Sequence, residues 1–268
     1  MKTLAASVRQ HFPEYLIEAW ALGMFMISAG VVTWMMESPG SIARSVIAND
    51  DVRRALIGIG MGLTGMALIY SPWGKQSGAH MNPAVTLTFL RLGKIKPIDA
   101  LCYAIAQFIG GALGVVLTIA LLGASFTQAP VDYVVTSPGP LGVGVAFIAE
   151  LIIAFVMMST VLQFSNRKSL MRYTGVASGV LVATYIAFEA PLSGMSLNPA
   201  RSFASAMPAG QWHDLWIYFL APPLGMLSAA WCYERVPGAQ VLCAKLIHAA
   251  NVRCIHCGYE PDAPTSCN

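Results

Sequence analysis

The sequence predicts an all-α membrane protein with six transmembrane helices and two re-entrant half-helices, arranged as an inverted repeat. Of the 268 residues, 56% are hydrophobic and 11% are charged, and the mean hydropathy is +0.61. So few polar residues cannot cover a soluble globule of this size, so lipid must solvate the chain. The tripeptide Asn-Pro-Ala occurs at 82–84 and again at 198–200, each time after Ser-Gly. This repetition indicates one site assembled from two related halves.

Six apolar segments have the length needed to cross about 30 Å of hydrocarbon. They are expected to be helices, because open sheets cannot span lipid and the alternation of barrel strands is absent. The first segment is too long for a signal peptide and has no small-x-small cleavage pattern after it, so we expect it to remain as an anchor. The predicted spans are Tyr15–Met36, Ala55–Trp73, Ala100–Leu122, Leu141–Phe164, Tyr173–Ala190 and Leu215–Tyr233.

The basic residues predict how the chain lies in the membrane. With six spans, Arg44, Arg53, Arg54 and Arg201 fall on one side, and the other Lys and Arg residues, from Lys2 to Arg253, fall on the opposite side. The richer side is cytoplasmic by the positive-inside rule. We therefore expect a multi-pass integral protein of the cell membrane, plasma or inner, with both termini in the cytoplasm. The net charge of +3 is then a topology signal, and no nucleic-acid partner is indicated.

The two halves match beyond the tripeptides. Glu18 and Glu150 occupy the first and fourth spans, and small residues recur four positions apart in the spans around each tripeptide, which allows helix backbones to approach closely. The pairs are Gly58 and Gly62, Gly175 and Gly179, Gly110 and Gly114, and Gly225 and Ala229. Because three spans separate the halves, the second copy enters from the opposite face. The segments are an N-terminus (1–13), a first repeat (14–124), an inter-repeat loop (125–140), a second repeat (141–235) and a tail containing cysteines (236–268).

Each tripeptide begins a stretch that is too apolar for an exposed loop and too short to span a membrane. Asn is a favoured N-cap and Pro a favoured first helical residue, so Asn82-Pro83-Ala84 and Asn198-Pro199-Ala200 predict helix starts at membrane depth. Irregular backbone is tolerated there only if it is buried or lines a cavity. One half-helix enters from each side, and both asparagine amides are expected to face one lumen near the midplane.

These motifs resemble the aquaporin (major intrinsic protein) family over residues 12–235. The resemblance rests on the two Asn-Pro-Ala boxes, on Arg201 after the second box, on Glu18 and Glu150, and on Gln107-Phe-Ile-Gly110 in the third span. It implies an aquaporin-like fold, a channel for water or small neutral solutes, and a homotetramer with a pore in each protomer.

The candidate residues also have simpler interpretations. Asn82 and Asn198 could be plain N-caps, and Arg201 could be an interfacial anchor, although its place in the first turn after Asn198 favours the lumen. The two glutamates could carry protons, but their symmetric placement favours a structural role as acceptors for the re-entrant loops. His80 either lines the pore or senses pH, and pore lining is preferred.

The expected lumen favours neutral cargo. Two helix N-termini and two amide donors make the centre electropositive, and Arg201 adds a full charge, so cations, including hydronium, meet a barrier. The narrowest part of the family's pore falls on Met61, Ile186, Met195 and Arg201. Water-selective members carry an aromatic residue and a histidine at the first two positions, so this filter is more apolar. In contrast, Ser202, Ala206 and Tyr218-Phe219 resemble the water-channel branch. We expect water with some small neutral solutes; the alternative is a facilitator mainly for glycerol, urea, hydrogen peroxide or ammonia.

The cysteines allow two interpretations. Cys102 and Cys232 fall in spans and are expected to pack there. The tail gathers Cys243, His248, Cys254, Cys257 and Cys267, and a cytoplasmic tail keeps thiols reduced. Cys254-Ile-His-Cys257 has half of a zinc-ribbon spacing, and Cys243 with His248 could complete a metal site. The preferred interpretation is a flexible tail with incidental cysteines.

Three classes of function are compatible with a repeated membrane fold: a passive pore, a secondary transporter and a membrane enzyme. A coupled transporter usually needs an acid in its lumen, and the two symmetric glutamates are otherwise explained. The spans contain no evident nucleophile pair, metal cluster or phosphate loop. The sequence therefore predicts a passive channel that is not an enzyme and needs no cofactor.

Overall fold

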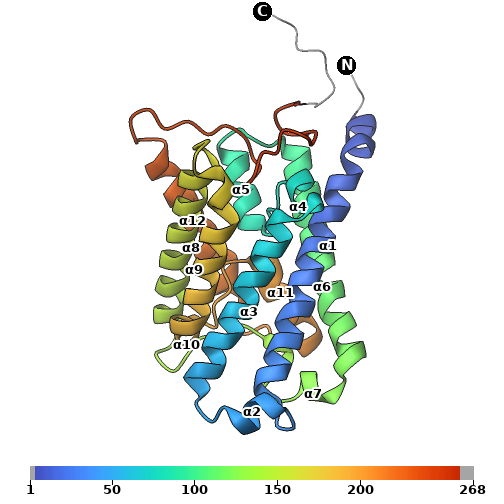
Figure 1. Ribbon diagram of the computed structural model, residues 1–268, viewed down its shortest axis with the longest axis vertical. Coiled ribbons are helices and arrows are strands. Elements are labelled where there is room, and N and C mark those ends of the chain that lie inside the picture. Colours follow the sequence, from blue (N-terminus) through green and yellow to red (C-terminus); the bar gives the residue numbers. More distant parts are fainter. Residues whose placement is uncertain (1–3, 260–268) are drawn as a thin grey trace, which may run out of the picture.

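The computed structural model describes residues 4–259, with side-chain surroundings from residue 8 onward, and all regular elements in this range are helices (Figure 1). The segments containing α1, α3, α6, α8 and α12 are long and apolar enough to cross a membrane. The sixth predicted span is α9, whose 15 residues extend only about 22 Å and which is followed by the short α10. The long helices are α1 (Leu4–Glu37), α3 (Asp50–Tyr70), α6 (Pro97–Leu122), α8 (Val143–Ser165), α9 (Thr174–Phe188) and α12 (Leu215–Tyr233).

The first helix begins well before the predicted span, because buried polar partners continue its packing. His11 Nδ1 lies 2.8 Å from Asp99 Oδ1 of α6, and the Tyr15 hydroxyl donates to the same carboxylate at 2.5 Å. Glu14 is fully buried and pairs with Arg253 of the tail. Residues 4–13, expected as a separate N-terminus, are thus a helical extension of the first repeat. Lys2 and Cys267 lie outside the described residues.

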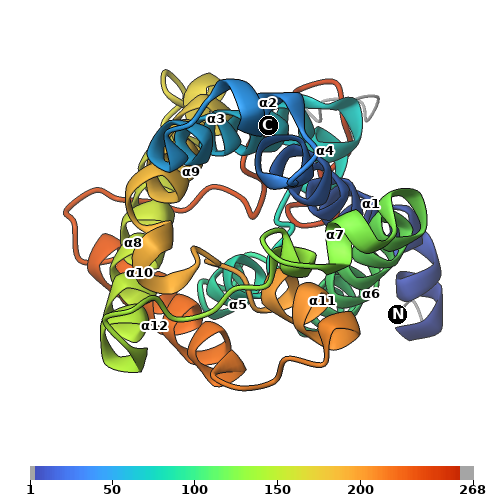
Figure 2. The ribbon, with the colours of Figure 1, turned by 90° about the horizontal axis from the view of Figure 1, so that it is seen from below.

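Small residues bring the long helices together in pairs that repeat between the halves. A Cβ on Gly110 would lie 2.0 Å from the carbonyl oxygen of Ala19, so α6 and α1 are in backbone contact. The equivalent pair in the second half is α12 and α8, where a Cβ on Gly225 would lie 2.3 Å from the carbonyl oxygen of Leu151. Gly62 and Gly179 join α3 to α9 in the same way. These contacts leave a ring of helices around a central axis, seen in Figure 2.

The two predicted half-helices are α5 (Pro83–Arg91) and α11 (Pro199–Ala209), each of which begins at the proline of its tripeptide. Asn82 caps α5 by accepting from the Ala84 N–H at 2.8 Å. Asn198 caps α11 by accepting from Ala200 N–H at 3.0 Å and Arg201 N–H at 3.2 Å. Both caps follow the expected preference of asparagine for helix N-termini.

The two ends of the bundle are covered by different segments (Figure 1). The start of α1 and the tail residues 236–259 lie at one end, called the terminal end below, and the inter-repeat segment lies at the other, called the far end. The inter-repeat segment is anchored by the buried side chains of Phe126 and Val131. The short helices are α2 (Ile42–Val46), α4 (Pro72–Ser77), α7 (Ala124–Thr127), η1 (Asp132–Val134), η2 (Met171–Tyr173) and α10 (Ala190–Ser193).

Candidate functional site

A cavity of about 350 Å³ lies between the helices. Much of its wall is formed by one face each of α1, α3, α8 and α9, since lining residues on these helices recur mainly three or four positions apart. From Ile57 to Ile69, the α3 lining residues cover roughly 18 Å of helix axis. The lining continues from Val134 at the far end to Leu246 of the tail. The cavity therefore runs along the bundle between its two covered ends.

The starts of the two half-helices meet in the middle of this cavity. Asn82 Nδ2 donates to the carbonyl oxygen of Leu197 at 2.7 Å, and Asn198 Nδ2 donates to that of Met81 at 2.7 Å. Each asparagine thus bridges to the loop of the other half. Both side chains line the cavity. An amide group carries two N–H donors, so each asparagine retains one that these cross-links do not use.

The loop before α5 is held by the buried carboxylate of Glu18. Its Oε1 accepts from the His80 N–H at 3.1 Å and from the Ser77 hydroxyl at 2.7 Å. Its Oε2 accepts from the Met81 N–H at 2.6 Å and from Gln107 Nε2 at 2.8 Å. These bonds satisfy backbone donors that have no helix to pair with.

The loop before α11 repeats this arrangement around Glu150. Its Oε1 accepts from the Ser196 N–H at 2.6 Å and the Ser193 hydroxyl at 2.9 Å, and its Oε2 accepts from the Leu197 N–H at 2.8 Å. Ser193 also bonds to Glu189, a buried acid of the same loop. Both loops alternate through left-handed backbone at Ala79, Met81, Met195 and Leu197. Non-glycine residues keep that conformation only where the surroundings fix it, as the two carboxylates do here.

Backbone carbonyls provide acceptors next to the asparagine donors. Among the described residues, no protein donor reaches the carbonyl oxygens of Ala79 and His80 in one loop, or of Met195 and Ser196 in the other. All four residues line the cavity. Buried backbone carbonyls normally find partners, so these oxygens are available to water or a solute hydroxyl.

The four residues of the predicted filter all lie on the cavity wall: Met61, Ile186, Met195 and Arg201. Arg201 is positioned by the inter-repeat segment, since its Nη1 donates to the carbonyl oxygen of Val134 at 2.8 Å. In the described part of the chain, Arg201 is the only Lys, Arg, Asp or Glu among the lining residues. The filter thus combines three apolar side chains with one fixed cation.

His80 lies on the wall toward the terminal end, where both of its ring nitrogens have partners. Nδ1 lies 3.0 Å from the Thr86 hydroxyl, and Nε2 lies 2.6 Å from the carbonyl oxygen of Ala244 in the tail. Since a carbonyl can only accept, Nε2 carries the proton in this arrangement. The ring is therefore fixed between α5 and the tail.

Sequence reasoning missed two features of the site. Tyr103 and Tyr218 donate to the carbonyl oxygens of Ser77 at 2.7 Å and Ser193 at 2.5 Å, one in each half. The four-residue spacing of Tyr103 and Gln107 on one helix face was the available signal for the first. The second feature is Leu246, whose contribution to the cavity has no local sequence signal because the tail lacks helical periodicity.

Comparisons with known proteins agree with this geometry. The family model described as major intrinsic protein matches residues 6–233. The chain is 32% identical over 248 residues to aquaporin NIP2-2 of Zea mays, covering 89% of this chain and 78% of that protein. It is 35% identical over 211 residues to glycerol uptake facilitator protein-like 6 of Lactiplantibacillus plantarum, covering 78% and 95%. The protein therefore belongs to the major intrinsic protein family and is an integral multi-pass membrane channel.

The same fold is found in the X-ray structure of the aquaglyceroporin from Plasmodium falciparum. The TM-score is 0.72 at 20% sequence identity, over 84% of this chain and 96% of that one. The likeness confirms the predicted fold class of helices without strands.

Proposed function

We propose that this protein is a passive channel for water and small neutral solutes such as glycerol, and that it excludes protons and other cations. The proposal rests on the central cavity, where two asparagine donors and the unpaired loop carbonyls lie between an arginine and an apolar wall. In such a passage, neutral molecules that both donate and accept hydrogen bonds can exchange their hydrogen bonds to water for hydrogen bonds to the wall.

Exclusion of cations follows from the positive groups along the pathway. The N-termini of α5 and α11 face each other at its centre, and each carries a partial positive charge. The free N–H of each asparagine donates to the oxygen of a central water, so the protons of that water point away from the asparagines. This orientation interrupts a continuous chain of proton transfer. Arg201 adds a full charge toward the far end.

Passage of a small polyol is supported by the mixed character of the filter. Met61, Ile186 and Met195 provide apolar contact, and Arg201 provides donors. A polyol has carbon atoms along one side and hydroxyl groups along the other, so it fits a wall divided in this way. Relatives named as aquaporins and as a glycerol uptake facilitator support the same range of solutes.

The proposal extends to the setting of the channel. The distribution of basic residues supports a cell membrane location with both termini in the cytoplasm. The resemblance to aquaporins supports a homotetramer in which each protomer holds its own pore. Glu18, Glu150, Gln107 and the Pro-Ala pairs then serve as supports, while the filter residues, His80 and the asparagines contact the solute.

Stopped-flow light scattering of proteoliposomes tests this function. Vesicles with the protein should shrink faster than empty vesicles in an impermeant osmolyte, and should re-swell faster in glycerol. Gly65→Phe is the matched blocked control, because Gly65 lines the cavity and a Cβ there meets nothing within 4 Å. Rates equal to those of the blocked variant would overturn the proposed function.

A further inference from the structure

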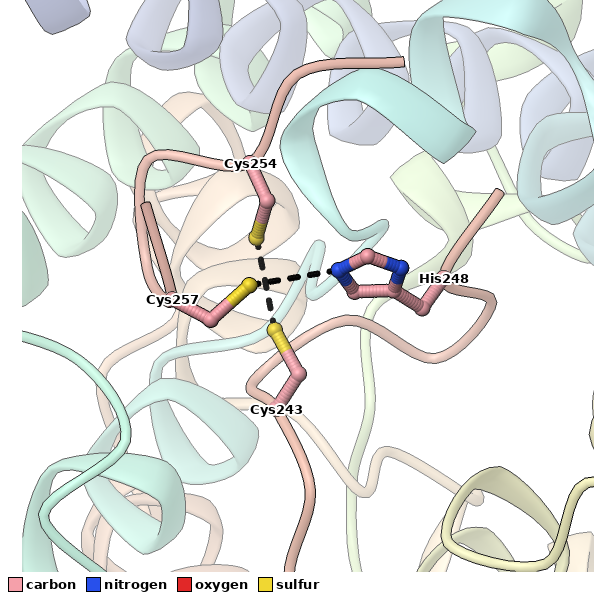
Figure 3. A group of neighbouring side chains, drawn as sticks. All are labelled: Cys243, His248, Cys254 and Cys257. Atoms are coloured by element: carbon pink, nitrogen blue, oxygen red, sulfur yellow. Dashed lines mark hydrogen bonds between the residues drawn. The ribbon is translucent and has the colours of Figure 1, made fainter. Parts of the chain in front are cut away.

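The tail carries a cluster of metal-binding side chains outside the cavity. Figure 3 shows Cys243, His248, Cys254 and Cys257 pointing toward one another, and their four donor atoms all lie within 4.8 Å of one another. The closest pairs are Cys243 Sγ to Cys254 Sγ at 3.3 Å and His248 Nε2 to Cys257 Sγ at 3.2 Å. We propose that these four residues bind one Zn²⁺ ion, and that the ion holds the tail across the terminal end of the channel.

The donor set and its spacing suit zinc. Three thiolates and one imidazole form a common structural zinc site, with Zn–S near 2.3 Å and Zn–N near 2.0 Å, which separates the donors of a tetrahedron by about 3.5–3.8 Å. The observed separations bracket this range, so only small side-chain movements are needed. The 3.3 Å between Cys243 and Cys254 is far longer than a disulfide bond of about 2.05 Å.

Local backbone geometry positions Cys254 and Cys257. Cys254 and Cys257 lie on one tight turn, closed by the Gly258 N–H on the Cys254 carbonyl at 2.9 Å and by the Cys254 N–H on the Tyr259 carbonyl at 2.7 Å. Gly258 has a φ of +76°, which permits the turn. The His248 ring packs edge-on against Tyr259, with ring centroids 5.4 Å apart. The turn and the ring are therefore ordered without a disulfide.

The negative charge of such a site has a positive counterpart in the buried side chain of Lys245. Zinc with three thiolates carries a net charge of −1. Lys245 is only 2% exposed, and its Nζ donates to the Arg253 carbonyl at 2.6 Å. A buried ammonium is costly unless anions lie nearby, and Lys245 stands two residues after Cys243 in the chain. Cys257 is exposed, so an ion can enter from solvent.

The residues between the ligands connect this cluster to the cavity. Ala244, next to Cys243, accepts from His80, and Leu246 donates its N–H to the Gly78 carbonyl at 3.2 Å while lining the cavity. His256, which lies between Cys254 and Cys257 in the chain, has its Nε2 3.2 Å from the Ser77 carbonyl oxygen. Arg253 pairs with the buried Glu14 at 2.8 Å. Fixing the four ligands thus fixes the segment that covers the terminal end.

A consequence for conduction rests on the proposed function. When zinc is removed, the tail loses the cross-links that run through the ion and keeps only its hydrogen bonds and ion pair to the bundle, so Leu246 can leave the cavity wall more often. Solute flux should then rise. The site thereby makes conduction depend on bound metal.

The binding test uses the full-length protein purified under reducing conditions. Mass spectrometry of metal content should find about one zinc ion per chain, and cobalt substitution should give the visible absorption of tetrahedral cobalt thiolate. Cys254→Ser and Cys257→Ser should lose the ion, whereas Cys232→Ser, a thiol in α12 away from the cluster, should keep it. Zinc content that is unaffected by Cys254→Ser would overturn the site. So would a Cys243–Cys254 disulfide in a protein that binds no zinc after this disulfide is reduced.

The conduction test compares zinc-loaded and chelator-stripped protein after reconstitution. Water flux should rise at least about twofold on stripping, and the Cys254→Ser variant should already have the higher flux and no response. Unchanged flux in the parent, with zinc lost, would overturn the role of the ion in covering the channel. Absence of flux in both states, in protein that bound zinc before stripping, would contradict the proposed function while leaving the metal site in place.

Discussion

In the first half of the chain Glu18 accepts hydrogen bonds from Ser77, His80, Met81 and Gln107, and in the second half Glu150 accepts from Ser193, Ser196 and Leu197. The loop donors correspond one to one. Each half also contributes an asparagine to the loop of the other and a tyrosine to a loop carbonyl. The centre of the pathway is thus built by two copies of one arrangement.

The ends of the cavity do not share this symmetry. At the far end, the inter-repeat segment offers the Val134 carbonyl to Arg201. At the terminal end, the tail offers the Ala244 carbonyl to His80 and places Leu246 on the cavity wall. The difference shows that the repeat supplies a symmetric support, while the segments outside the repeat make one end a charged filter and the other a covered mouth.

Removing a supporting carboxylate should have the largest effect. Glu18→Ala leaves buried donors unsatisfied at about 1–3 kcal/mol each, so we expect loss of several kcal/mol and little folded protein in detergent. Glu150→Ala should destabilise the fold almost as much, since Glu150 accepts the same loop hydrogen bonds as Glu18 and lacks only an equivalent of the bond from Gln107. Thermal unfolding and size-exclusion chromatography measure both. The control is Glu234→Gln, which breaks the exposed ion pair with Arg91 and should cost under about 1 kcal/mol. A folded Glu18→Ala protein with the parent melting temperature would contradict the supporting role of the two buried carboxylates.

Helix pairing should show the next largest effect. Gly110→Leu and Gly225→Leu force a side chain into a neighbouring backbone, and each should destabilise the fold by about 3 kcal/mol or more. Gly144→Leu is the matched control, because Gly144 lies in α8 with nothing within 4 Å of its Cβ position. Melting temperatures in one detergent decide the outcome. Equal melting of all three variants would mean that these contacts do not hold together the helix pair within each half.

Arg201→Val distinguishes the far end, which carries the filter, from the terminal end. Loss of a full positive charge should raise proton or ammonium leakage at least about tenfold, which corresponds to about 1.4 kcal/mol. Water flux should persist. His80→Val, at the other end, should leave the proton leak low. A pH-sensitive dye inside proteoliposomes measures both, and unchanged leakage in Arg201→Val would show that this arginine is only an anchor.

The smallest expected effect concerns solute preference at the filter. Met61→Phe combined with Ile186→His narrows the passage and adds a polar partner for water. The ratio of glycerol flux to water flux should fall by about tenfold. The single change Met157→Leu, in the lining of α8, conserves volume and is the control. If the ratio is unchanged while the parent conducts glycerol, the constriction lies elsewhere.

Local sequence signals predicted the centre of the molecule better than its ends. Asn82-Pro83 and Asn198-Pro199 specify helix starts by capping chemistry, and Glu18 and Glu150 are acids that the membrane tolerates only with partners. The tail has no periodic pattern, and its contacts are distant in sequence, such as Leu246 with Gly78. Spacing offered Cys243, His248, Cys254 and Cys257 only as the less preferred of two interpretations, because their gathering depends on packing against the bundle.

Solute flux through the paired half-helices tests the central claim most directly. Water, glycerol and proton fluxes should be measured in the same preparation of zinc-stripped proteoliposomes, for the parent and for Gly65→Phe. Water and glycerol should cross the parent vesicles well above the blocked variant, and proton flux should remain at the level of empty vesicles. Neutral solute flux that is unchanged by the block, or proton flux that rises with the amount of parent protein, would contradict the account.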